Sequence, residues 1–149
     1  RVERVGGGTF LLFDSFGGLL REDRDAADRE CFENTGCWGD GRISPDQFEL
    51  IEQGLDADDS TRIAVVHHHL EPSPAAKVNP LQNADEFLEW CRLHNVGHVF
   101  VGHWHDTTES RDIGGVTRLR IGRSTKFPYP FGLLDTEAGT YEIRALREQ

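Results

Sequence analysis

The alternation of short apolar segments with amphipathic ones is the feature that most constrains the fold. Three apolar segments have the length and the Val, Ile, Leu and Phe content of buried strands, at 9–13, 62–66 and 98–101. Two segments with helical periodicity lie between them, at 44–55 and 83–97. Four further strand-like segments follow, at 107–113, 115–121, 131–136 and 140–146. This order predicts an α/β fold with a mixed sheet and a terminal antiparallel meander.

Both helical segments carry start signals. Ser44 with Gln47, and Asn83 with Glu86, have the spacing of a capping box, and Pro45 suits a first helical position. The predicted buried faces contain Phe48, Ile51 and Leu55 in the first helix, and Phe87, Trp90 and Cys91 in the second. Gly97 is the expected stop of the second helix.

Composition limits the classes of partner. The 149 residues suffice for one domain with a core, and no apolar run approaches the roughly 18 residues of a membrane span. The net charge of −10 disfavours nucleic acid and anionic membranes, so an anionic substrate would need a local arginine or a bound metal. We interpret the Arg1 start, in a chain without methionine, as a sign that an N-terminal part is absent.

The three cysteines indicate no disulfide framework and favour a reducing compartment such as the cytoplasm. Cys31 and Cys37 are interpreted as free thiols, because their spacing matches no common zinc motif; pairing or metal binding stays open. Residues 17–41 are expected to form a solvated loop.

Five of the seven histidines follow two predicted strands. His67, His68 and His69 come after one strand, and His103 and His105 after another. The carboxyl ends of such strands are where ligands bind in open α/β sheets. In extended backbone His103 and His105 face one side, and neutral imidazole is a common ligand of Zn2+, Mn2+ and Fe2+.

Alternatives stay open at both places. His103 and His105 are equally compatible with a pair of surface side chains. Alternation predicts His67 and His69 on one side and His68 on the other, and it does not choose between them. His94 and His98 are expected to be structural.

Taken together, these segments resemble the calcineurin-like metallophosphoesterases. The strand with "HHHLEP" is similar to that family's His-His-Pro element, and "GHVFVGHWHD" is similar to its strand and Gly-His-x-His. "FLLFDS", "GRISPDQFELIEQGL" and "FGLLDTEAGTYEI" also resemble family segments in the same order. The implied fold is the C-terminal half of a four-layer α/β/β/α sandwich, with residues 1–149 forming a single partial domain.

The resemblance implies a hydrolase of phosphate monoesters or diesters with two divalent metal ions, Mn2+, Fe2+ or Zn2+. His67 and His103 would bind one metal and His105 the other, while His69 occupies the proline position. His68 would be a neighbour of the site, and Asp106 either orients a ligand or lies in an ordinary turn.

The family's Asp-x-His, Gly-Asp and Gly-Asn-His-Asp/Glu elements do not occur here in their expected place, and Gly39-Asp40 is interpreted as loop. Without their carboxylates we expect the isolated chain to be inactive, its natural partner being the missing N-terminal half. One rival is a non-enzymatic phosphoesterase-like interaction module; another is a mononuclear zinc or iron site. No substrate-binding residue is assigned. The loop at 71–80 offers only Lys77 as a cation near a possible pocket, and Arg123, Ser124 and Lys126 are better explained as solvated surface than as phosphate contacts.

Overall fold

The structure is a computed structural model of the chain. It describes residues 1–15, 41–57, 61–71, 80–103, 109–121, 130–135, 137–138 and 140–145. The predicted loop at 17–41, with Cys31, Cys37, Gly39 and Asp40, lies outside these residues apart from Gly41. Among the described helices, none has both the length and the apolar character that crossing a membrane requires.

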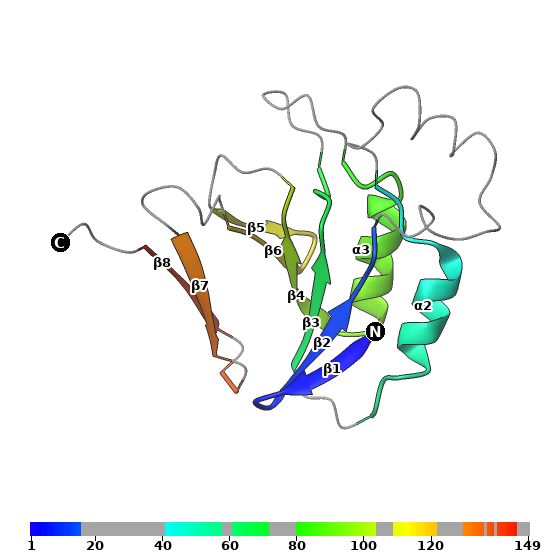
Figure 1. Cartoon of the computed structure of the whole chain (residues 1–149), viewed down its shortest axis with the longest axis horizontal. Helices are drawn as coiled ribbons and strands as arrows, with labels where there is room; N and C mark the ends of the chain where they lie inside the picture. Colours follow the sequence, from blue (N-terminus) through cyan, green and yellow to red (C-terminus); the bar gives the residue numbers. More distant parts are fainter. Residues whose placement is uncertain are drawn as a thin grey trace.

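A six-stranded mixed sheet forms the centre of the described fold (Figure 1). Its order is β1-β2-β3-β4-β6-β5. The strands β2, β3, β4 and β6 are parallel, and the edge strands β1 and β5 are antiparallel to their neighbours. The bounds are β1 Val2–Val5, β2 Gly8–Leu12, β3 Thr61–Val66, β4 Val96–Val101, β5 Glu109–Ile113 and β6 Val116–Arg120. The predicted α/β class with a mixed sheet is confirmed.

The predicted terminal strands are present and antiparallel, but they form two separate pairs in different sheets rather than one meander. The strand β6 pairs in parallel with β4 and so belongs to the main sheet. The last two strands, β7 (Pro130–Asp135) and β8 (Thr140–Ala145), form a separate antiparallel pair. No sequence signal indicated β1, which forms a hairpin with β2. Gly6 and Gly7 make that hairpin turn with φ of +57° and +82°, a region that glycine enters without steric cost.

Two helices cover one face of the sheet (Figure 1). They are α2 (Pro45–Glu52) and α3 (Ala84–Leu93), and each connects two parallel strands. The predicted faces are confirmed for Phe48, Ile51, Phe87, Trp90 and Cys91, which are buried; Leu55 is partly buried against the same core. On the sheet they meet Leu11, Phe13, Ala64, Val66, Val99 and Val101.

Neither capping box forms as predicted, although Ser44 and Asn83 do precede the helices. The Gln47 amide instead exchanges two hydrogen bonds of 2.8 Å with the backbone of Asp14. The Asn83 amide does the same with the backbone of Ile43, at 2.9 and 3.1 Å. Both side chains therefore connect their helix to another segment, a choice that local spacing does not reveal.

Gly97 is not the stop of α3, because it lies within β4. The helix ends at Leu93, and Asn95 provides the left-handed residue beyond it, with φ of +56°. Asparagine tolerates this conformation better than most residues that carry a Cβ.

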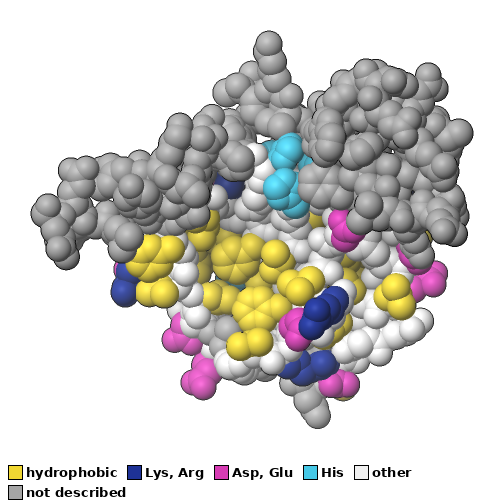
Figure 2. Space-filling model, viewed as in Figure 1, with side chains coloured by type: hydrophobic (Ala, Val, Ile, Leu, Met, Phe, Trp, Pro, Cys, Tyr) yellow, Lys and Arg dark blue, Asp and Glu magenta, His cyan; other side chains and the backbone are white. Residues whose placement is uncertain are grey.

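The opposite face of the sheet is also apolar. By strand register it carries Phe10, Ile63 and His98 in one row and Leu12, Val65, Phe100 and Leu119 in the next. Ile63 and Leu119 are buried, whereas Leu12 is 37% exposed. Figure 2 shows hydrophobic side chains gathered on this side of the molecule, with β7 and β8 beside them in Figure 1.

Candidate functional site

The ends of β3 and β4 bring two of the predicted ligands together. These strands are parallel neighbours, with Val66 paired to Val101, so their carboxyl ends lie at one edge of the sheet. His67 follows Val66 directly, and His103 follows Val101 after Gly102. The Gly102 N–H donates a 2.9 Å hydrogen bond to the His67 carbonyl, which extends the pairing beyond the last strand residues. Histidines 36 positions apart thus become neighbours.

The two imidazoles face each other through their ring nitrogens. His67 Nε2 lies 2.9 Å from His103 Nδ1, and the ring centroids are 4.8 Å apart. His67 is exposed and His103 is half-buried. Figure 2 shows histidine side chains at the surface near the upper border of the apolar area.

His103 also has an uncommon backbone conformation, with φ of +67°. For a side chain with a Cβ, the left-handed region costs of order 1 kcal/mol and persists where surrounding contacts hold it. The residue with this unfavourable backbone conformation is therefore one of the two whose rings meet, with centroids 4.8 Å apart, at the end of β3 and β4.

His68 is the buried member of the triplet. Its side chain is 0% exposed, and its Nδ1 lies 2.7 Å from Ser15 Oγ, which is buried as well. Its ring centroid is 4.8 Å from that of His103. Gly41 packs so closely on the ring that an added Cβ would lie well under 3.0 Å from Cγ. His68 therefore lies in the interior, next to the exposed His67 and the half-buried His103.

His69 is buried too, at 3% exposure, and its carbonyl accepts a 2.6 Å hydrogen bond from Leu81 N–H. Burial, together with the charge of Arg120 and the neighbouring His103, lowers the pKa of His69 to about 4. The burial of the triplet does not alternate, because His68 and His69 are both buried and His67 is exposed. The reason is that β3 ends at Val66, so the twofold periodicity of a strand does not apply beyond it.

The other predicted residues divide into two groups. His105, Asp106, Lys77, Arg123, Ser124 and Lys126 lie outside the described residues. His94 and His98 are described and lie away from the pair. His94 stacks on Trp90 with centroids 4.3 Å apart and contacts Glu52, and His98 faces Tyr141 of β8. These contacts agree with the structural interpretation of both.

The described residues provide two of the ligands that a metal ion would need. The two ring nitrogens lie at hydrogen-bond distance from each other, and a cation bound to both needs them roughly 3.3 Å apart, a few tenths of an ångström more than observed. Within the described residues, no three His, Cys, Asp or Glu side chains are placed to hold a metal together. That set includes His67 and His103 but not His105.

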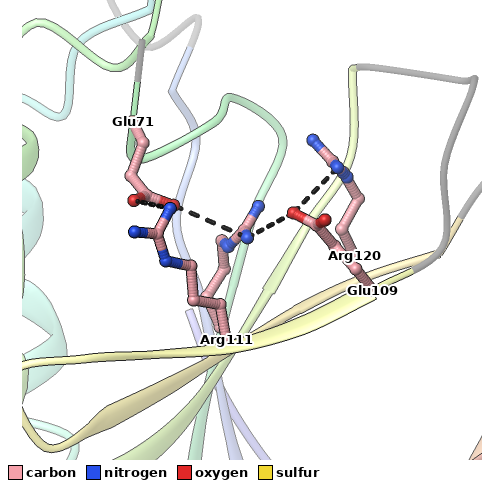
Figure 3. A network of polar contacts seen from close by, with 5 residues as sticks. Glu71, Glu109, Arg111 and Arg120 are labelled. Carbon is pink, nitrogen blue, oxygen red and sulfur yellow. Dashed lines mark hydrogen bonds and ion pairs between the residues drawn. The ribbon is translucent and has the colours of Figure 1, made fainter. Parts of the chain in front are cut away.

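A network of charged side chains beside the triplet was not anticipated from the sequence (Figure 3). Arg118 and Arg120 of β6 both contact Glu109 of β5, at 2.5 and 2.8 Å. Glu71, which follows the triplet, contacts Arg111 at 2.8 Å and Arg118 at 3.5 Å. The alternating Arg-Leu-Arg of β6 was the available signal, since it places both arginines on one face.

Comparison with known proteins supports the fold alone. No family model matches the chain, and no curated protein does. One solved crystal structure matches 99% of this chain with a TM-score of 0.57 at 10% identity. The protein TT1561 of Thermus thermophilus matches 68% of this chain with a TM-score of 0.45 at 16% identity. This chain spans 52% of the first structure and 40% of the second.

Proposed function

We propose that this chain is the histidine-bearing half of a calcineurin-like metallophosphoesterase domain, which hydrolyses phosphate monoesters or diesters. The observation that carries the proposal is the approach of His67 Nε2 to His103 Nδ1 at 2.9 Å, at the ends of adjacent parallel strands. The left-handed conformation of His103 adds to it, because such strain is concentrated at functional sites.

The architecture supports the proposed half-sandwich. Helices cover one face of the main sheet, and the other face is apolar with Leu12 and Val5 exposed at 37% and 63%. A sheet with two apolar faces normally packs against a layer on each side. In the proposal, this second face packs against the sheet of the other half, which gives the four-layer α/β/β/α arrangement.

In the proposal, the chain's own residues have the roles that the family resemblance implies. His67 and His103 hold one cation through ring nitrogens, and His105 holds the second. His68 supports the His103 ring from below, and its hydrogen bond with Ser15 holds the orientation of its own ring. When bound, the two divalent ions, Mn2+, Fe2+ or Zn2+, supply the positive charge that attracts a phosphoester to a chain of net charge −10.

The proposal assigns the missing carboxylate ligands to the other half of the domain, so the isolated 149 residues have no phosphoesterase activity. Calorimetric titration of the chain with Zn2+ tests the metal site directly. We expect binding that His67→Ala and His103→Ala each weaken by at least about tenfold, because each removes one of few ligands. His94→Ala is the matched control, since that imidazole lies at the end of α3.

The outcomes separate the proposal from its rivals. Absence of Zn2+ binding by the wild-type chain would contradict a metal site and favour the non-enzymatic interaction module. One tightly held ion per chain, retained after removal of excess Zn2+, would favour the mononuclear site. Phosphoesterase turnover by the chain alone with Mn2+, lost in His103→Ala, would contradict the proposed division of the site.

A further inference from the structure

The charged network of Figure 3 joins Glu71, which lies four residues after His67, to the β5–β6 hairpin. The strand β6 pairs in parallel with β4, whose last residue, Val101, precedes Gly102 and His103. The Arg118 Nη2 atom is 2.5 Å from Glu109 Oε1 and 3.5 Å from Glu71 Oε2. A single guanidinium group of β6 therefore contacts the carboxylate that follows the triplet and a carboxylate of its own hairpin.

Arg118 occupies a position where an apolar residue would be expected. Its strand register places it in one row with Leu11, Ala64 and Val99 on the helix-covered face of the sheet. Its side chain is only 4% exposed. Its partners Glu71 and Glu109 are 28% and 45% exposed, so the buried partner is the guanidinium. The cost of burying that charge offsets much of what the contacts contribute, so stability alone does not explain an arginine here.

The end of the triplet segment contacts this network. The segment begins at the hydrogen bond between His67 and Gly102, and the bond from Leu81 to His69 lies further along. Glu71 then binds Arg111 and Arg118, both from the β5–β6 hairpin. Glu109 is the first residue of the same hairpin, whose strand β6 pairs in parallel with β4, the strand that leads to His103.

We propose that Arg118 is a positioning residue that sets the placement of His67 relative to His103 by holding Glu71 against β6, with Glu109 orienting its guanidinium group. The link to metal binding rests on the function proposed above, whereas the effect on imidazole placement does not. Arg118 touches neither imidazole in this scheme; it acts on His67 through Glu71, whereas His103 follows β4, the strand that pairs with β6.

The test compares three forms of the 149-residue chain. In the triple variant Glu71→Gln, Arg118→Met, Glu109→Gln the charges are removed together, so no buried charge loses its partner. Arg118→Lys keeps the charge but loses the planar set of guanidinium donors, and it replaces the triple variant in the test if the triple variant does not fold. Arg144→Met with Glu142→Gln, an exposed pair of β8, is the matched control.

Two measurements are made on each form. Long-range proton–nitrogen spectra of the metal-free imidazoles report the surroundings of His67 and His103, and competition with a chromophoric chelator gives the Zn2+ affinity. We expect shifted His67 and His103 signals and roughly tenfold weaker Zn2+ binding in the triple variant. Arg118→Lys should shift the same signals by less, and the control pair should leave both measurements unchanged.

The results distinguish this inference from the proposed function. A folded triple variant, or Arg118→Lys in its place, with wild-type imidazole signals would overturn the positioning role. Shifted signals in a chain whose wild type binds no Zn2+ would support positioning while contradicting the metal site. Shifted signals with unchanged Zn2+ affinity would overturn the link between positioning and metal binding.

Discussion

Gly41 shows how closely the buried side of the histidine site is packed. An added Cβ would lie well under 3.0 Å from both Cγ and Nδ1 of His68, and the His68 ring has little freedom because Nδ1 also bonds Ser15. The absence of a side chain at position 41 is therefore required by His68, which lies 27 residues further along the chain.

We predict that Gly41→Ala lowers the free energy of unfolding by roughly 1–3 kcal/mol, because a buried ring and its hydrogen bond must shift. Urea denaturation measures the change. The matched control is Gly97→Ala, where no atom lies within 4 Å of the added Cβ; we expect it to stay within about 0.5 kcal/mol of the wild type. Equal losses in the two variants would contradict the close packing on His68.

Glu109 makes a pH-dependent contribution. The hydrogen bond from Arg118, with the charges of Arg120 and Arg111, lowers the pKa of this carboxyl below its ordinary value of 4.5. As pH falls below that value, the unfolded chain takes up the proton first, so the contribution is present above pH 4.5 and lost below it.

We therefore predict that the wild type loses stability more steeply than Glu109→Gln as the pH falls from about 6 to about 3, in urea denaturation series. Glu142 is the control, because Arg144 lowers the pKa of that exposed carboxyl in the same direction. High salt should reduce the change in stability caused by Glu142→Gln more than the change caused by Glu109→Gln, because salt screens ion pairs between exposed side chains. Parallel curves for the wild type and Glu109→Gln would contradict the prediction.

At the scale of elements, the end of α3 depends on a single left-handed residue. Asn95 has φ of +56° and follows the last helical turn, where its N–H donates 3.2 Å to the Arg92 carbonyl. The turn leads directly into β4, the strand that carries His103.

We predict that Asn95→Ala destabilises the chain by about 1 kcal/mol, because alanine gains nothing to offset a left-handed backbone. The free energy of unfolding of Asn95→Gly should equal that of the wild type or exceed it by about a few tenths of a kcal/mol. Thermal unfolding followed by circular dichroism compares the two. A glycine variant less stable than the alanine variant would show that the Asn95 side chain, rather than its backbone conformation, is what matters.

At the scale of the whole molecule, the two sheets differ in how well they are packed. The central strands β3 and β4 contain Ile63, Ala64 and Val99, each 0% exposed, whereas Phe131 and Leu133 of β7 are 37% and 43% exposed. The sheets meet at few described points, such as His98 with Tyr141 and Gly132 with Ile121.

Hydrogen exchange should reflect this difference. We expect the amides of β3 and β4 to exchange slowest and those of β7 and β8 to exchange much faster, since local opening follows the apolar contacts of each unit. Tyr141→Ala should accelerate exchange in β7 and β8 while leaving β3 and β4 unchanged. Uniform acceleration across both sheets would contradict the separation into two units.

The sequence alone determined the elements that rest on local periodicity. The strands at 62–66 and 98–101 and the apolar faces of both helices were predictable, because side-chain burial repeats every two or about 3.6 residues along the chain. It also placed histidines after two strands whose ends must share an edge if they are parallel.

The tertiary structure decided what depends on residues distant in sequence. It paired β6 with β4 rather than in a meander, and it gave the Gln47 and Asn83 amides backbone partners in other segments in addition to their contacts with Ser44 and Glu86. It also brought His67 to His103 and joined the segment after His67 to β6 through Arg118. The local sequence pattern cannot predict these pairings, because each depends on contacts between distant residues that form only when the chain folds.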